Sequence, residues 1–167
     1  MSNIFNKLDN YFNKIITVQQ FIANIFLILI MLIVTFDVLG RNLFNTPIKG
    51  SYEMVELGAA LMIFFAFALT HREGEHISIN FVVEKFPIKV QHILNGIVEI
   101  GISVMLLFMA RHVFANGIRM MERYRTTTDL SIPIYPFLFI ITVTIIIFAL
   151  TAIFKAINQF RLEMSKE

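Results

Sequence analysis

The sequence predicts an all-α integral membrane protein with four transmembrane helices and two short amphipathic helices lying in the membrane plane. Hydrophobic residues make up 57% of the 167 positions and charged residues only 16%, and the mean hydropathy is +0.73. Four apolar runs fill the chain, and the first and last are uncharged from Ile15 to Phe36 and from Leu130 to Phe154. A helix of about 20 apolar residues crosses the roughly 30 Å hydrocarbon core. We therefore expect a single membrane domain over residues 1–167.

The first half of the chain predicts an in-plane helix followed by a helical hairpin. Apolar residues recur at helical spacing over residues 3–15, opposite a polar face, which is typical of a helix at the membrane interface. The first transmembrane helix then spans about 16–40. Asn45, Pro47 and Gly50 predict a tight turn. The second transmembrane helix spans about 51–71 and runs antiparallel to the first.

The second half predicts another in-plane helix and two further crossings. Residues 78–86 are too few to span a bilayer, and Ser78 and Pro87 are suited to begin and end a short amphipathic helix. The third transmembrane helix spans about 90–115. A polar stretch separates it from the fourth, at about 130–156, in whose first turns Pro133 and Pro136 are tolerated.

Four crossings place both termini on the same side of the membrane. By this topology eight of the 14 Lys and Arg residues lie on the side of the termini and six on the other. The excess of positive charge predicts that both termini are cytoplasmic.

Charged residues near the ends of the predicted helices form one candidate site. Asp37 and Arg41 share a face of the first helix, and Glu53 and Glu56 share a face of the second. Arg111, in the third helix, lies at the same level of the membrane. Because charges inside a membrane are costly, we expect these residues to form an ion-pair cluster that fixes the packing of the three helices. A cation or proton site built from the carboxylates is the alternative interpretation.

Glu99 lies about two turns inside the third helix, among apolar residues and glycines. Exposure to lipid would be costly there, and His71, near the end of the second helix, is the expected partner. Glu99 is interpreted as a contact between helices or subunits, with a role in proton relay as the alternative.

The composition argues against several classes of function. The chain has no Cys, its net charge is +2, and we expect no nucleic acid binding. Nucleotide-binding loops, metal-binding His pairs at helical spacing and a nucleophile beside a base are all absent from the sequence. We therefore expect no catalytic residue, metal or cofactor. A haem held by His71 and His92 is the one cofactor hypothesis that the histidines suggest, since both lie at similar predicted depth.

Short motifs along most of the chain resemble the small membrane subunit of TRAP (tripartite ATP-independent periplasmic) transporters, the DctQ-type component. The matching residues are Asp37 and Val38, Arg41 to Asn45 with Pro47, Ser51 to Glu56, Arg72, Gly74, His76 and Ile77, Phe86 and Pro87, Gly117, and Leu130 to Pro133. Four crossings joined by short loops agree with this resemblance.

The resemblance implies a subunit of a three-part importer in the bacterial cytoplasmic (inner) membrane. Its partners would be a large TRAP membrane subunit, which carries an organic acid by a sodium-driven elevator motion, a periplasmic solute-binding protein, and the lipid bilayer. This chain would act as a non-enzymatic scaffold, with Arg72 and His76 among the residues that set helix packing or the subunit interface.

Three arginines on the predicted extracytoplasmic side, Arg119, Arg123 and Arg125, are candidates to contact acidic groups of the binding protein. A solvated loop is the alternative for these arginines. Two other functions remain open: a self-sufficient four-helix ion-coupled carrier, and a haem-carrying membrane anchor subunit.

Overall fold

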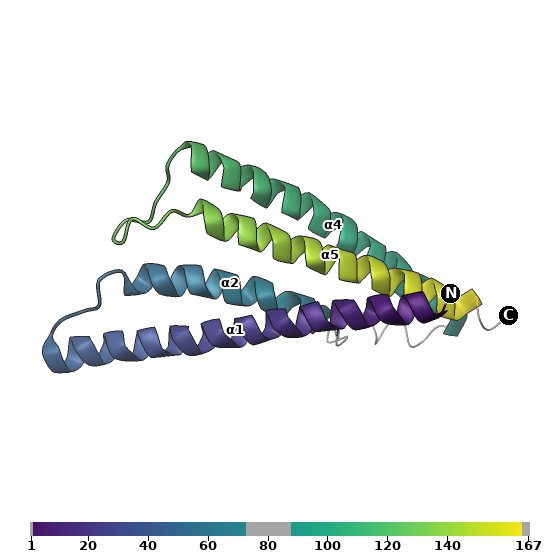
Figure 1. The fold of residues 1–167 in the computed structure, drawn as a ribbon, viewed down its shortest axis with the longest axis horizontal. Helices are drawn as coiled ribbons and strands as arrows, with labels where there is room; N and C mark the ends of the chain where they lie inside the picture. Colours follow the sequence, from purple (N-terminus) through teal and green to yellow (C-terminus); the bar gives the residue numbers. More distant parts are fainter. Residues whose placement is uncertain (1, 73–87, 165–167) are drawn as a thin grey trace.

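The computed structural model describes residues 2–72 and 88–164 and is built from four α-helices (Figure 1). They are α1 (Ser2–Phe44), α2 (Ser51–Arg72), α4 (Ile88–Glu122) and α5 (Tyr135–Met164). Each contains a stretch long and apolar enough to cross a membrane. The described residues contain no β-strand beyond an isolated bridge between Thr126 and Pro133. The prediction of an all-α protein with four membrane-spanning helices is therefore confirmed.

The two predicted in-plane helices are not confirmed. Residues 3–15 form the beginning of α1, which continues without a break into the first apolar run. The helix has 43 residues and a length of about 65 Å, roughly twice the thickness of the hydrocarbon core. No residue that breaks helices interrupts α1. The first Gly of the chain is Gly40, near the end of the helix, and the first Pro is Pro47, which follows the helix. The second predicted in-plane helix, 78–86, lies outside the described residues.

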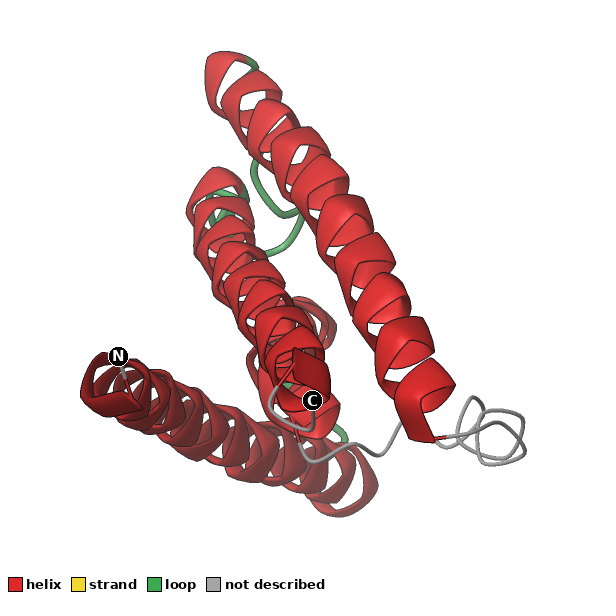
Figure 2. Cartoon of the chain, turned by 90° about the vertical axis from the view of Figure 1, so that its right-hand side faces the viewer, coloured by secondary structure: helices red, strands yellow, loops and turns green. Residues whose placement is uncertain are grey.

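The helices form two antiparallel hairpins, α1 with α2 and α4 with α5, which meet through α2 and α5. The hairpins converge where the chain begins and ends, called the terminal end here (Figure 1). They spread apart toward the opposite end, the loop end, which carries the turn 45–50 and the loop 123–134. Figure 2, viewed from the terminal end, shows α1 and α4 on opposite outer sides of the molecule.

The α4–α5 hairpin is held together by small side chains. Buried small residues recur in α4 at intervals of seven, at Gly96, Ser103, Ala110 and Gly117. Such residues let two membrane helices approach closely. The Ser103 hydroxyl donates a hydrogen bond to the Ala149 carbonyl of α5 at 3.2 Å. A Cβ on Gly117 would lie 2.9 Å from the Phe139 ring, so glycine is needed at this contact.

The α1–α2 hairpin exposes far more of its apolar surface. Gly58 of α2 lies against Ile30 of α1, and the rings of Phe26 and Phe65 stack at 6.4 Å. Among the described side chains of α1, the buried ones are Ile16, Gln19, Ala23 and Asp37. The remaining apolar faces of α1 are open to lipid or to another protein.

The loop before α5 is longer than expected. The fourth crossing was predicted from about residue 130, but α5 begins at Tyr135. Ser131 has a φ of 55°, and Pro133 takes part in the bridge to Thr126, so residues 130–134 complete the loop instead of starting the helix.

Candidate functional site

Asp37 fastens the turn 45–50 to the end of α1. Its Oδ2 lies 2.8 Å from the Arg41 guanidinium, one helical turn away, and its Oδ1 accepts a hydrogen bond of 2.8 Å from the Ile48 N–H. The carboxylate is largely buried, whereas the Arg41 side chain is 58% exposed. Asp37 therefore satisfies a backbone donor outside the helix and a side chain within it at the same time.

Glu53 joins the two hairpins at the loop end. Its carboxylate accepts hydrogen bonds from the N–H groups of Asp129 at 2.6 Å and Leu130 at 3.0 Å, both in the loop 123–134. The side chain of Leu130 packs over Gly50, where an added Cβ would overlap with Leu130 Cγ. Gly50 also has a φ of 74°, a conformation that favours glycine. The start of α2 is thus shaped to receive this loop.

The loop itself is ordered by its own hydrogen bonds. The Thr127 N–H donates to the Ile132 carbonyl at 2.9 Å, and the Ile132 N–H donates to the Thr127 hydroxyl at 3.0 Å. At the start of the loop the Arg125 N–H donates to the Met120 carbonyl of α4 at 3.0 Å. The contact with Glu53 therefore holds a preformed loop, and not a loose segment.

The predicted cluster of five charged residues is not assembled. The structure brings Asp37 and Arg41 together, but both oxygens of Glu53 are occupied by backbone N–H groups instead of arginine. Glu56 and Arg111 are exposed, and neither forms an ion pair with another described residue. The reason lies in the helix packing, because α4 packs on α5 and not on α1.

A second charged group lies at the terminal end and connects three helices. Glu99 of α4 lies 2.7 Å from His71 Nε2 of α2 and 3.1 Å from Lys155 Nζ of α5. Lys155 also donates a hydrogen bond of 3.0 Å to the His71 carbonyl. His71 is 1% exposed, and its ring lies 5.0 Å from that of Phe148. We call Glu99, His71 and Lys155 the terminal-end triad.

Sequence reasoning named two members of the triad and missed Lys155. The missed signal is its position as the first charge after the long uncharged run of α5. The antiparallel pairing of α4 and α5 brings that end of α5 to the level of Glu99. Two other predicted residues are not placed: the Arg72 side chain and His76 lie outside the described part of the chain.

The three candidate arginines, Arg119, Arg123 and Arg125, all lie exposed at the loop end. Between them, Tyr124 is 90% exposed and has a φ of 47°. The backbone here is fixed by the contacts of the loop, so the structure presents these arginines on an ordered surface.

The described residues contain no group of three or more His, Asp or Glu side chains placed to hold a metal ion. For the haem hypothesis, His71 faces Glu99, and the His92 side chain lies outside the described part. The buried carboxylates have a structural role. Each one among the described residues lies within 3.1 Å of a donor from another segment of the chain. Such contacts fix the order of helices in a membrane.

The comparison with protein families gives one match that covers most of the chain. Residues 30–162 match the family described as tripartite ATP-independent periplasmic transporters, DctQ component. The matched region begins within α1 and ends within α5, and it contains the Asp37 and Glu53 contacts and the terminal-end triad. The comparison with curated protein sequences gives no match.

Proposed function

The chain belongs to the DctQ family of tripartite ATP-independent periplasmic transporters, and from this premise we propose that it is the scaffold partner of the large membrane subunit. It is a multi-pass membrane protein and a component of a transporter. In the proposed complex the large subunit moves an organic acid across the inner membrane by a sodium-driven elevator motion. A periplasmic binding protein delivers the substrate.

The observation that carries the scaffold proposal is the way the buried carboxylates are used. Asp37, Glu53 and Glu99 each hold one segment of this chain against another. An elevator mechanism requires a fixed frame against which the transport domain moves. Contacts that tie α2 to α5 at one end and to the α4–α5 loop at the other suit such a frame. The exposed apolar faces of α1 offer surface for the large subunit.

The proposed orientation places the loop end in the periplasm and the termini in the cytoplasm. The exposed Arg119, Arg123 and Arg125 then face the compartment of the binding protein, where they meet acidic groups on its surface. Charge reversal of all three to Glu is expected to weaken docking and slow import. Lys49→Glu is the matched control, because Lys49 is exposed in the other connection at the same end. Unchanged docking by the triple variant would contradict this role.

Reconstitution tests the scaffold function directly. Proteoliposomes that contain the large subunit, this chain and the binding protein are expected to import the organic acid along a sodium gradient. Omission of this chain is expected to abolish import while the soluble protein still binds its substrate. Import that persists without the chain would disprove the proposal.

Two measurements on this chain alone separate the alternative functions. If this chain alone carries a solute, and Glu99→Gln abolishes that flux, it is a self-sufficient ion-coupled carrier and not a scaffold. A Soret band in the absorbance spectrum of the purified chain would instead identify a haem-carrying membrane anchor. The engagement of Glu99 by His71 and Lys155 favours the scaffold over the carrier, since each oxygen of the carboxylate already has a partner from another helix of this chain.

A further inference from the structure

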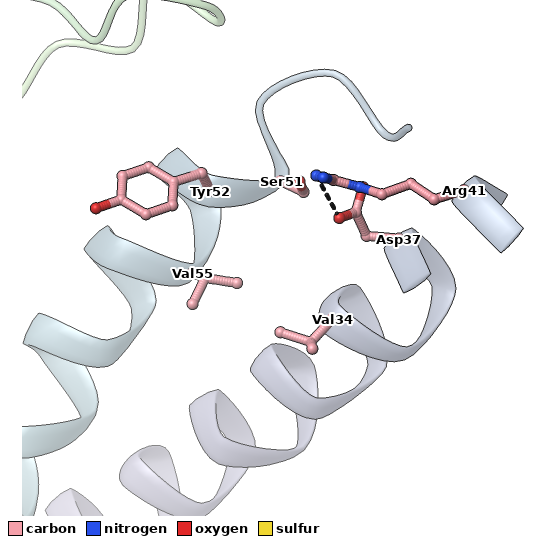
Figure 3. Close-up of a pocket in the computed structure, with 6 residues that line it drawn as sticks. All are labelled: Val34, Asp37, Arg41, Ser51, Tyr52 and Val55. Atoms are coloured by element: carbon pink, nitrogen blue, oxygen red, sulfur yellow. Dashed lines mark ion pairs between the residues drawn. The ribbon is translucent and has the colours of Figure 1, made fainter. Parts of the chain in front are cut away.

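A hollow opens between α1 and α2 near the loop end (Figure 3). Its volume is about 170 Å³. The lining residues are Val34, Asp37 and Arg41 from α1 and Ser51, Tyr52 and Val55 from α2. The ion pair of Asp37 and Arg41 forms part of its polar wall.

The lining changes from polar to apolar along the direction of the helices. Arg41 and Tyr52 lie at the rim, within the last turn of α1 and the first turn of α2. Val34 and Val55 lie about one turn further toward the middle of the membrane than Asp37 and Ser51 (Figure 3). A phospholipid has the same order, with a charged phosphate at the interface and acyl chains directed inward.

Arg41 supplies the charge that such a ligand requires. A guanidinium has five N–H donors, and the contact with Asp37 uses one of its terminal nitrogens. The side chain is 58% exposed, so its other donors face outward from the ion pair. Hydrogen bonds between Arg and phosphate are among the stronger ones in proteins. Asp37 holds the guanidinium in place, because its own carboxylate is fixed by the Ile48 N–H.

We propose that this hollow binds a phospholipid of the surrounding bilayer. Arg41 holds the lipid phosphate, Tyr52 borders the headgroup, and Val34 and Val55 contact the first methylene groups of an acyl chain. Basic sites between transmembrane helices are suited to lipid headgroups. The apolar wall distinguishes this ligand from a free anion, which would gain nothing from Val34 and Val55. The proposal does not depend on the transport function.

Fluorescence provides the test, because the chain contains no tryptophan. Tyr52→Trp places one fluorophore at the rim of the hollow, and Tyr124→Trp places one on the exposed loop as a control. The purified proteins are titrated in detergent with phosphatidylglycerol or phosphatidylethanolamine brominated on the acyl chains. Saturable quenching is expected for Tyr52→Trp but not for Tyr124→Trp. Equal quenching of both variants would overturn the proposal.

Two further substitutions in the Tyr52→Trp protein test the assigned contacts. Arg41→Gln is expected to raise the lipid fraction at half-quenching roughly tenfold, as for the loss of a charged hydrogen bond. Arg111→Gln, which removes another exposed arginine, is expected to have no effect.

Val34→Phe fills the hollow without touching the ion pair, and it is expected to weaken quenching at an unchanged melting temperature. Met31→Phe, on an exposed position of the same helix, is its control.

A final experiment distinguishes a phospholipid from a soluble phosphate compound as the ligand. Inorganic phosphate and glycerol phosphate, added at concentrations comparable to the lipid, are expected not to relieve the quenching. Relief by either anion would show a site for a soluble ligand and overturn the proposal. Unchanged lipid binding by both Arg41→Gln and Val34→Phe would overturn it as well.

Discussion

Glu53 and Glu56 stand three residues apart in α2 and have opposite surroundings. Glu53 is 7% exposed and accepts two backbone hydrogen bonds from the loop 123–134, whereas Glu56 is exposed. Helical spacing places both on neighbouring positions of one face, but it does not tell which of them a distant loop will reach. The difference between the two carboxylates is therefore a property of tertiary structure.

This pair provides a matched test of the loop contact. Glu53→Ala leaves the N–H groups of Asp129 and Leu130 without their acceptor, so the loop is expected to open more often. Cleavage by trypsin after Arg123 and Arg125 is expected to become several-fold faster, and the melting temperature is expected to fall. Glu56→Ala should change neither. Equal cleavage rates for the two variants would contradict the proposed role of Glu53.

At the terminal end, the sequence indicated a charged contact but not its full membership. The apolar surroundings of Glu99 predicted a buried partner, and His71 was the expected one; the structure places them 2.7 Å apart. Lys155 was not among the partners expected for Glu99. Its contribution depends on how α4 and α5 pack together, which the spacing of charged residues in the sequence does not give.

A double-mutant cycle measures the contribution of Lys155. Glu99→Gln and Lys155→Met each remove one charge, and the two changes together should destabilise the protein less than the sum of the single effects. Because the Lys155 side chain is 32% exposed, the expected coupling is small, about 0.5–1 kcal/mol, as for partly solvated pairs. Thermal unfolding in detergent provides the four values. Strict additivity would mean that the 3.1 Å contact contributes nothing to stability.

Among the elements, α1 and α4 show what a hydropathy pattern can and cannot predict. The pattern predicted the crossings, because an apolar run of sufficient length has few alternatives in a bilayer. It did not predict that residues 3–15 continue α1, since a polar face changes the environment of a helix without breaking it. The interval of seven between Gly96, Ser103, Ala110 and Gly117 was visible in the sequence and marks the face of α4 that packs on α5.

Two glycines of α4 allow a test of this packing face. A Cβ on Gly117 would lie 2.9 Å from the Phe139 ring, whereas one on Gly101 would meet no atom within 4 Å. Gly117→Leu is expected to destabilise the protein by about 1–3 kcal/mol through overpacking. Gly101→Leu is expected to be neutral or to stabilise it by up to about 1 kcal/mol through helix propensity. Similar melting temperatures for the two variants would mean that the close approach of α4 and α5 is unimportant.

At the scale of the whole molecule, the antiparallel order of four helices places the turn 45–50 and the loop 123–134 at one end and the termini at the other (Figure 1). This order follows from the number of crossings and was predictable. The spread of the hairpins was not, because it depends on which helices pack together and on how closely their side chains allow them to approach.

The orientation in the membrane can be tested by cysteine labelling, because the chain has no cysteine of its own. Tyr124→Cys lies at the loop end and Lys14→Cys toward the terminal end, and both positions are exposed. With cytoplasmic termini, a membrane-impermeant maleimide is expected to label the first variant in intact cells and the second only after lysis. The reverse pattern would invert the proposed topology and remove the arginines of the loop end from the periplasm.

The contact between Glu53 and the loop 123–134 also has a consequence for the order of events during synthesis of the chain. Glu53 and Asp129 are 76 positions apart in the chain. At about 5–20 residues per second, a ribosome needs roughly 4–15 s to make the intervening segment. During that interval the first hairpin has no loop to receive, and the Glu53 carboxylate must remain hydrated. Glu53 can remain hydrated because it lies in the first turn of α2, beside the aqueous phase. Its contact with the loop then forms only when the second hairpin is complete.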